Sequence, residues 1–539
     1  MVAQPPELEL KLPEVVKRMK SLEELTSIVQ TGLQLIKAEP DLIEGCVYAS
    51  SNHRTVGRIC YSSHIPSNGL EEPKSDEDWG VSVELWFKRS GQKLLGFGHE
   101  ANEFSIEGIK RAIFKARRDA VADSEFHGFL KPYEFSIKQS KLPKKYHDDY
   151  LLNLTSEAEA KMLSKISWDT IAGALDTITE YSQNQHLTPN QAAFILNGDN
   201  FLIRERMALA TTNGIYDSDE STVNLSFLTA MLERANSKGS AWGARIKLTD
   251  DLSPYEIGKL AALAAINGVG GKRITSNKYS VVFGHQAVTE LFGSLLLSHV
   301  NLGMVDFGAT IFRGKYGQQV ASPLLTLYDD ATLIGGPGSK RITCEGHPTG
   351  KTLLIEKGKL VGYLADSRTR NKLLGKPKIA KQLIGADPHE IAHAIAPQNG
   401  FRFARGGGRV AGASICISAT NLVVDSPTPL PPAELLKKVG DGIYIGRLWY
   451  TYPVGGYSSG VISGTAIADC YEIKNGKLTT PILPNTIRLV DNLNQMINNI
   501  IGIGNNQIPT MLWASDEITH APWVAIANVN LQAINLKVE

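Results

Sequence analysis

Cysteine and net charge are both scarce in this sequence. Its five cysteines, Cys46, Cys60, Cys344, Cys416 and Cys470, are scattered over 539 residues without a Cys-x-x-Cys pair. Neither a disulfide framework nor a thiolate zinc knuckle is therefore indicated. The 56 Lys and Arg residues against 55 Asp and Glu leave a net charge of +1. This balance offers no electrostatic case for binding nucleic acid or an anionic membrane.

Long apolar runs are also missing. No stretch approaches the length of a membrane-spanning helix, and the opening MVAQPPELELKLPEVVKRMK lacks the apolar core of a signal peptide. We therefore expect no membrane contact and a cytoplasmic location. The sequence is 42% hydrophobic and 21% charged, as in ordinary globular proteins, and its length predicts two to four domains.

The first part of the chain, residues 1–130, predicts an α+β domain. Apolar residues alternate over 81–87 before a KRSG turn, which indicates a β-hairpin. Ser105 is a good N-cap for the amphipathic helix that follows, and this helix would cover the hairpin. A further helix is expected over 11–38.

The rest of the chain changes character twice. Residues 131–150 are polar and contain two prolines, which predicts a linker. Residues 151–315 predict central helices and strands, including a helix that begins with the capping pair Ser253 and Pro254. Residues 316–539 are rich in glycine and in short β-branched strands. The expected fold class is α+β, with an N-terminal α/β domain (hairpin and covering helices) and a glycine-rich, β-sandwich or barrel-like C-terminal domain.

Several stretches, in this order, resemble the TldD/PmbA family. The hairpin GVSVELWF…GQKLLGFG with the helix EGIKRAIFKARRDA resembles the family's N-terminal domain, and TTNGIYDSDESTVNLSFLTAMLE resembles its strand pair. The stretch EIGKLAALAAINGVGGKRITSNKYSVVFGHQAVTELF resembles the approach to its central helix. TLLIEKGKLVGYLADSRTRNKL and DGIYIGRLW…SGTAIADCYEIKNGKLTTPI resemble its C-terminal β-domain. The resemblance runs from about residue 40 to the C-terminus.

The resemblance implies a heterodimeric zinc metallopeptidase that acts on small, poorly structured peptides. TldD-like subunits hold the metal with a His-Glu-x-x-x-His helix and a cysteine near the C-terminus, whereas PmbA or TldE-like subunits lack both. At the matching positions this chain has Thr289, Glu290 and Ser294, and hydroxyl groups are poor zinc ligands. Cys470 lies before the C-terminal loop, which contains no sulfur donor. We therefore expect no catalytic residue and no metal in this chain, and zinc in a TldD-like partner.

A second string, HEIAH at residues 389–393, has the spacing of a zinc-peptidase helix. Asp387 and Pro388 offer another explanation, because they suit the N-cap and the first position of a short helix, with Glu390 completing a capping box. Neither a metzincin continuation nor an acidic third ligand follows nearby, although a distant ligand such as His347 stays open. We favour a short capped helix that carries two ordinary histidines.

The glycine-rich FARGGGRV, residues 403–410, also allows two interpretations. Arg405, Arg409 and the flexible backbone between them would suit contact with a peptide carboxylate or another anion. The interpretation that we favour is a β-turn at the rim of the C-terminal sheet.

Three functions follow from these observations. The favoured one is a non-catalytic PmbA/TldE-like subunit that pairs with a TldD-like catalytic subunit to process small peptides. The main alternative is an autonomous zinc peptidase that uses His389, Glu390 and His393. The third is a homodimeric peptide-binding protein without catalysis.

Overall fold

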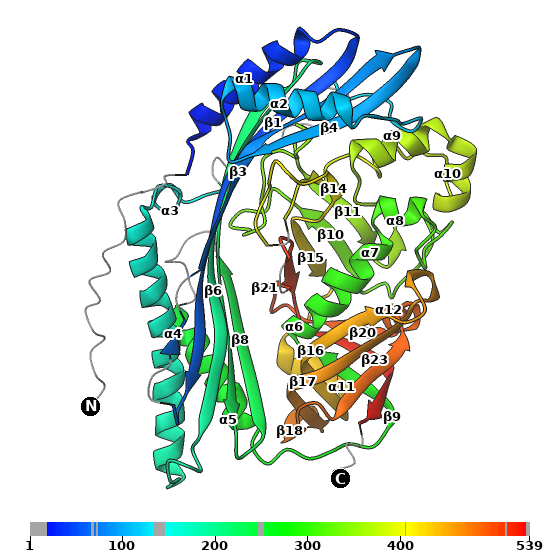
Figure 1. Ribbon diagram of the computed structural model, residues 1–539. Coiled ribbons are helices and arrows are strands. Elements are labelled where there is room, and N and C mark those ends of the chain that lie inside the picture. Colours follow the sequence, from blue (N-terminus) through cyan, green and yellow to red (C-terminus); the bar gives the residue numbers. More distant parts are fainter. Residues whose placement is uncertain are drawn as a thin grey trace.

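A computed structural model of the chain describes residues 19–65, 69–71, 74–132, 146–245, 253–404, 406–512 and 515–534. A long twisted sheet with helices on its outer face stands beside a β-rich C-terminal region (Figure 1). This arrangement confirms the expected α+β fold class. Residues 133–145 of the expected linker, and the start of the helix expected over 11–38, lie outside the described residues.

The described residues of the N-terminal half form one antiparallel eight-stranded sheet, in the order β5-β4-β3-β1-β6-β7-β8, with β2 paired to β1. The strands are β1 (Leu42–Ser62), β2 (Gly69–Leu70), β3 (Lys74–Arg89), β4 (Gln92–Ala101), β5 (Val121–Ala122), β6 (Phe194–Thr211), β7 (Tyr216–Leu232) and β8 (Ser237–Arg245). Strands from both sides of the expected linker thus pair directly, because β1 runs antiparallel to β6 along almost its whole length.

Two pairs of helices cover the outer face of this sheet (Figure 1). One pair is α1 (Leu22–Lys37) with α2 (Ile106–Arg118), and the other is α4 (Ser156–Asn184) with α5 (Pro254–Asn267); the short α3 (Asp149–Leu152) precedes α4. Their starts follow the expected capping chemistry: the side chains of Ser105 and Ser253 each accept a backbone N–H. Helices α1 and α2 bury their apolar sides against β1, β3 and β4, and α4 and α5 bury theirs against β6, β7 and β8.

Two sheets make up most of the C-terminal region. One has the order β12-β11-β10-β15-β22-β21, and the other has β16-β9-β23-β19-β17-β18 with β20 paired to β23. The strands are β9 (Asn277–Phe283), β10 (Thr326–Asp330), β11 (Lys351–Glu356), β12 (Lys359–Leu360), β13 (Gly400–Phe401), β14 (Cys416–Ile417), β15 (Asn421–Asp425), β16 (Gly442–Pro453), β17 (Val461–Lys474), β18 (Lys477–Pro481), β19 (Ile487–Asn492), β20 (Ile500–Ile503), β21 (Ile508–Met511), β22 (Ile518–Ala521) and β23 (Val524–Ala533).

One helical rod packs against both C-terminal sheets, touching β16 of one and β22 of the other. It comprises α6 (His285–Val288), the π-helix η1 (Thr289–Leu296) and α7 (Leu297–His299). Its apolar side chains belong to the largest hydrophobic cluster of the described residues. The remaining helices are α8 (Leu302–Asp306), α9 (Ser367–Gly375), α10 (Pro377–Ile384), α11 (Pro432–Val439), η2 (Tyr457–Ser459) and α12 (Leu493–Asn498).

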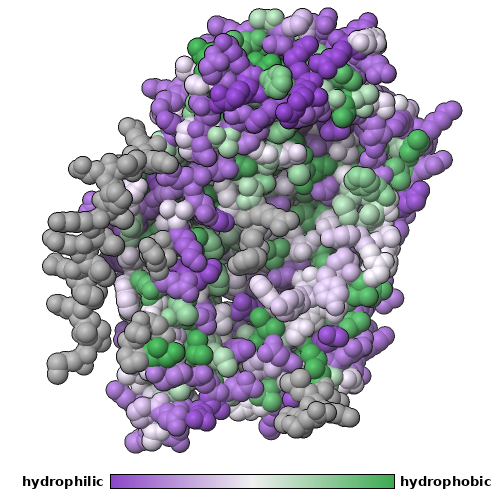
Figure 2. Space-filling model, viewed as in Figure 1, coloured by the Kyte–Doolittle hydropathy of each residue, from purple (hydrophilic) through white to green (hydrophobic). Residues whose placement is uncertain are grey.

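Within the described ranges, no helix combines the length and the apolar character that crossing a bilayer requires. On the face seen in Figure 2, hydrophilic residues dominate the end formed by α1, α2 and the β3–β4 hairpin, and hydrophobic residues are scattered.

Candidate functional site

The positions expected to correspond to the family's metal-binding helix fall on the π-helix η1. Its residues Thr289–Leu296 follow α6 without a break and pass directly into α7. Such wide helical turns are rare and are often found at functional sites. Thr289, Glu290 and Ser294 therefore lie on one helical rod in the middle of the C-terminal region, as the resemblance implied.

Glu290 is an internally hydrogen-bonded carboxylate. Its side chain is 8% exposed. One oxygen accepts a hydrogen bond from Gln286 Nε2 (3.0 Å), one turn earlier, and the other accepts one from the hydroxyl of Thr451 on β16. Burial raises the pKa of Glu290 above its usual value, while the Thr451 and Gln286 hydrogen bonds and the nearby Arg447 lower it. Both carboxylate oxygens are thus engaged within the protein.

The two hydroxyl residues on the same rod are engaged in different ways. Thr289 is buried; its hydroxyl donates to the carbonyl oxygen of His285 (3.0 Å) and also contacts the hydroxyl of Thr510 on β21. Gly293 packs so closely on β22 that a Cβ there would lie 2.4 Å from Thr519 Oγ1. Ser294 is half-buried. The β21–β22 hairpin therefore occupies the side of the helix at Thr289 and Gly293.

The histidines near this helix make structural contacts. His285 Nδ1 lies 2.7 Å from the carbonyl oxygen of Ala521. His299 ends α7 as expected, but it is buried between aromatic rings, and burial lowers its pKa to about 4. Burial also lowers the pKa of His520 to about 4. Among the described residues, no three His, Cys, Asp or Glu side chains converge in a way that could hold a metal ion.

The HEIAH string lies in a series of turns, so the expected short helix is wrong. The N-cap expectation holds locally, because Asp387 Oδ1 accepts the backbone N–H of His389 (2.9 Å). The chain does not continue as an α-helix, because Ala394 N–H bonds three residues back to Ile391 (2.8 Å) and a proline at 397 disfavours helical geometry before it.

All three candidate side chains of the string are exposed. His389, Glu390 and His393 face solvent, while the isoleucines beside them are buried. His389 Nε2 lies 3.1 Å from the carbonyl oxygen of Leu374 at the end of α9. The apolar members of this segment, not its histidines, hold it against the protein.

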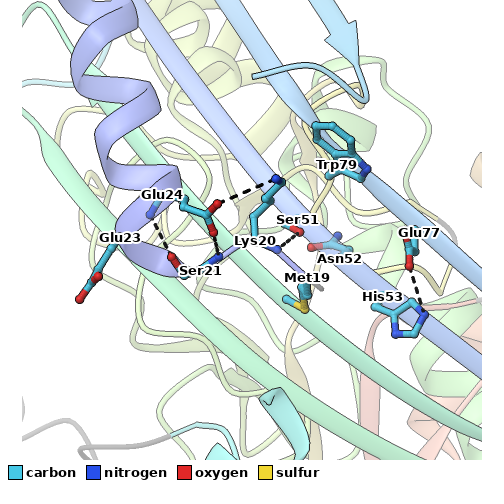
Figure 3. Close-up of a pocket in the computed structure, with 10 residues that line it drawn as sticks. All are labelled: Met19, Lys20, Ser21, Glu23, Glu24, Ser51, Asn52, His53, Glu77 and Trp79. Carbon is cyan, nitrogen blue, oxygen red and sulfur yellow. Dashed lines mark hydrogen bonds and ion pairs between the residues drawn. The ribbon is translucent and has the colours of Figure 1, made fainter. Parts of the chain in front are cut away.

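A polar cavity of about 640 Å³ lies on the outer face of the eight-stranded sheet. Figure 3 shows Trp79 and Glu77 of β3, His53 of β1 and Lys20 just before α1 around it. Its charged groups pair within the protein: Lys20 lies 3.9 Å from Glu24, and His53 lies 3.0 Å from a buried glutamate on α4. This cavity is on the opposite face of the sheet from the C-terminal region, because the neighbouring side chain of β1 reaches the glycine-rich loop instead.

Buried ion pairs join the eight-stranded sheet to the C-terminal region. Glu205 of β6 lies 2.7 Å from Lys340 Nζ and accepts a hydrogen bond from Arg409 Nε (3.1 Å), and Arg409 also donates to Asp219 of β7 (2.8 Å). Burial alone would raise the pKa of Glu205, but Arg409 and Lys340 hold it well below its usual range. The expected β-turn is confirmed, because Gly407 N–H donates to the carbonyl oxygen of Ala404 (2.9 Å) and Phe403 pairs with Arg409. Its expected place at a rim is wrong, because Arg409 is completely buried. Arg405 lies outside the described residues.

The sequence did not reveal these partners. Thr451 is 161 residues from Glu290, and Arg409 is 204 residues from Glu205. No local spacing connects such residues. The one available signal was the presence of charged residues within otherwise apolar strands, such as RERMALA at the end of β6.

Comparison with known proteins agrees with this architecture. Residues 276–533 match the family model described as the PmbA/TldA metallopeptidase C-terminal domain. The metalloprotease TldD homolog of Buchnera aphidicola is 27% identical over 307 residues, which cover 52% of this chain and 55% of that protein. The metalloprotease PmbA homolog of the same organism is 19% identical over 500 residues, 92% of this chain and 95% of that protein.

The fold extends to solved structures. The crystal structure of TldE from Thermococcus kodakarensis has a TM-score of 0.71 and 16% sequence identity, and the match covers 94% of this chain and 100% of that chain. The sequence matches are shorter, since the chain spans about half the length of several curated relatives. Residues 276–533 therefore carry the PmbA/TldA metallopeptidase C-terminal domain, and the chain is similar over most of its length to a PmbA homolog.

Proposed function

We propose that this chain is the non-catalytic, PmbA/TldE-like subunit of a heterodimeric zinc metallopeptidase that processes small unstructured peptides. The observation that carries the proposal is the state of the helix η1. Hydroxyl residues, Thr289 and Ser294, stand where the family's catalytic subunits have ligand histidines, and both oxygens of Glu290 accept hydrogen bonds from its neighbours.

The residues present on η1 do not fit a zinc ion. Zinc in proteins is held by imidazole, thiolate or carboxylate groups, and neutral threonine and serine hydroxyls are poor substitutes. The hydroxyl of Thr289 is already bonded to the helix backbone and to the β21–β22 hairpin. We therefore place the metal of the assembly in a TldD-like partner and derive no chemical step at η1.

The contribution of this chain would be to complete a chamber around the partner's site and to present an edge for the peptide. Two sheets end in edge strands that extended peptides can join by main-chain hydrogen bonds: β8 ends the eight-stranded sheet, and β21 ends the six-stranded one. Main-chain pairing of this kind suits small unstructured substrates, because it does not depend on their side chains.

The alternatives make different demands on the molecule. An autonomous zinc peptidase would need His389, His393 and a third ligand to converge, whereas both histidines are exposed on successive turns. A homodimeric peptide-binding protein would need no partner and would bind peptide without cleaving it. No particular contact in the described residues favours either alternative.

The test is to measure zinc and peptidase activity with and without the partner. The chain is purified alone and together with a TldD-like chain from the same organism, and zinc is measured by elemental mass spectrometry. We expect near zero zinc in the isolated chain, about one zinc per heterodimer, and cleavage of an unstructured peptide by the heterodimer alone.

The matched control is the double variant His389→Ala, His393→Ala. It should assemble, bind zinc and cleave peptide as the unchanged heterodimer does. One zinc in the isolated chain that is lost in this double variant would instead identify an autonomous peptidase. A homodimer that binds peptide and does not bind the TldD-like chain would support the function of a peptide-binding protein without catalysis.

A further inference from the structure

The glycine-rich loop at Gly406–Gly408 already binds a carboxylate. Asp516, in the connection between β21 and β22, places one oxygen 2.7 Å from the backbone N–H of Gly406 and the other 2.8 Å from that of Gly408. The two N–H groups are separated by that of Gly407, which donates to the carbonyl oxygen of Ala404 (2.9 Å). Converging backbone N–H groups form concave anion sites, and such sites capture the terminal carboxylates of peptides.

This loop is held in place independently of Asp516. The side-chain amide of Asn52 on β1 donates to the carbonyl oxygens of Gly407 (3.1 Å) and Arg409 (2.7 Å). Gly408 has φ +77°, and a Cβ there would lie 2.6 Å from Glu205 Oε2, so glycine is required. These contacts with the eight-stranded sheet fix the loop, so the backbone N–H groups of Gly406 and Gly408 are preorganised for a carboxylate.

Asp516 itself is held weakly for a buried carboxylate. Its hydrogen-bond donors among the described residues are two backbone N–H groups and no cation, while Glu517 and Glu205 nearby repel its charge. Burial raises its pKa to about 7, although the two glycine donors lower it. The charged form of Asp516 is therefore costly to keep in this position.

The connection that carries Asp516 also lies close to the helix η1. Its hairpin begins with β21, where Thr510 contacts Thr289, and returns along β22, where Thr519 packs on Gly293. The same short hairpin thus touches the helix η1 through the paired residues Thr510 and Thr519 and the glycine loop through the connection between its strands. The space around Asp516 is small, a cavity of about 10 Å³ next to Glu205 and Lys340, so a ligand must replace Asp516.

We propose that the Gly406–Gly408 loop is a binding site for the free C-terminal carboxylate of an extended peptide, with Asp516 as a built-in mimic of that carboxylate. This proposal rests on the proposed function, since it takes peptides as the ligands of this chain. It adds that the peptides are recognised at their C-terminal end, through backbone donors that accept any terminal residue.

The first test replaces Asp516 by glycine and supplies its carboxylate from solution. Asp516→Gly removes the CH₂–COO⁻ group, a loss that acetate matches in size and charge. We expect Asp516→Gly to unfold several degrees below the unchanged chain, because a domain of ordinary size shifts by a few degrees for each lost charge-assisted contact. Sodium acetate should recover about half of that loss relative to sodium chloride of equal ionic strength.

The matched control is Glu517→Gly, which removes the neighbouring carboxylate and leaves the glycine loop untouched. Acetate should stabilise neither this variant nor the unchanged chain beyond the effect of chloride. An equal effect of acetate and chloride on Asp516→Gly would overturn the proposal.

A second variant covers the case in which Asp516→Gly does not fold. Asp516→Asn keeps the shape of the side chain but presents an amide to one of the two N–H donors. An acetylated fluorescent tetrapeptide is titrated as the free acid and as the C-terminal amide. We expect Asp516→Asn to bind the free acid about tenfold more tightly than the unchanged chain does, which corresponds to about 1.4 kcal/mol, with no change for the amide. Equal affinities for acid and amide would contradict the proposal.

The two proposals fail separately. Acetate rescue requires neither a TldD-like partner nor cleavage, so rescue without an active heterodimer would remove the proposed function and keep the carboxylate site. An active heterodimer with no acetate effect and no preference for free-acid peptides would do the reverse.

Discussion

Two glutamates in this chain stand in strings that resemble the motif of zinc peptidases, and the protein treats them in opposite ways. Glu290 stands between the hydroxyl residues at 289 and 294 and is buried, with hydrogen bonds to each oxygen. Glu390 keeps both histidines and is exposed on a series of turns. The comparison shows that a sequence motif alone does not make a metal site. A metal ion needs ligand side chains that converge in space, and the order of residues in a string does not ensure this.

The first prediction compares how much each glutamate contributes to the free energy of unfolding, and it has the largest expected effect. Glu290→Ala removes a buried acceptor and leaves Gln286 and Thr451 without their partner, which should lower the free energy of unfolding by about 2–4 kcal/mol. Glu390→Ala, on the exposed turns, should change it by less than about 0.5 kcal/mol. Urea denaturation followed by circular dichroism measures both.

A conservative variant sharpens the result. Glu290→Gln keeps an acceptor for one donor and should lose less stability than Glu290→Ala. An equal loss of unfolding free energy in Glu390→Ala and Glu290→Ala would mean that the exposed string also has a structural role. The difference that we infer between the two glutamates would then be wrong.

Much of the fold could be predicted because its signals are local. The N-caps Ser105 and Ser253 begin helices where expected, and the apolar alternation over 81–87 does lie in β3 of a hairpin. Capping boxes and alternation depend on neighbours within a few residues, so one sequence is enough to find them. The turns at 388–395 are an exception, because capping residues predicted a helix there. In the structure this segment buries three apolar side chains and ends before a proline, and it forms turns instead.

The sequence supplies the residue types of the candidate site but not their partners. The hydroxyl residues at 289 and 294 are visible in the sequence, but the partners of Glu290 and Arg409 come from strands far along the chain. The backbone of the glycine-rich stretch contacts a carboxylate of this chain, that of Asp516, and Arg409 pairs with Glu205. Contact of this stretch with a peptide carboxylate stays a prediction. The tertiary fold determines which residues of the two sheets are in contact. These contacts cannot be predicted from the spacing of residues in the sequence.

The second prediction introduces imidazole groups into the helix η1. Thr289→His with Ser294→His gives η1 the string His-Glu-x-x-x-His, but Thr289 is packed against the hairpin at Thr510. A larger ring there should cost about 1–3 kcal/mol through overpacking. Elemental mass spectrometry should find no zinc in the isolated double variant. Stoichiometric zinc would show that the two missing imidazoles were the sole obstacle, and that the packing of the hairpin matters less than we infer.

The third prediction concerns pH and carries the smallest effect. Burial raises the pKa of Glu290 above the 4.5 of the unfolded chain, so the folded protein binds this proton more tightly than the unfolded chain does. Its contribution to stability is therefore fully present below about pH 4.5 and is lost as the pH rises through the raised pKa. Glu290→Gln, which cannot titrate, should flatten the fall in stability across that window. Thermal unfolding from pH 4 to 8 compares this variant with the unchanged chain. If the stability of Glu290→Gln fell with pH as steeply as that of the unchanged chain, Arg447 and the two hydrogen bonds would offset the effect of burial on the pKa of Glu290.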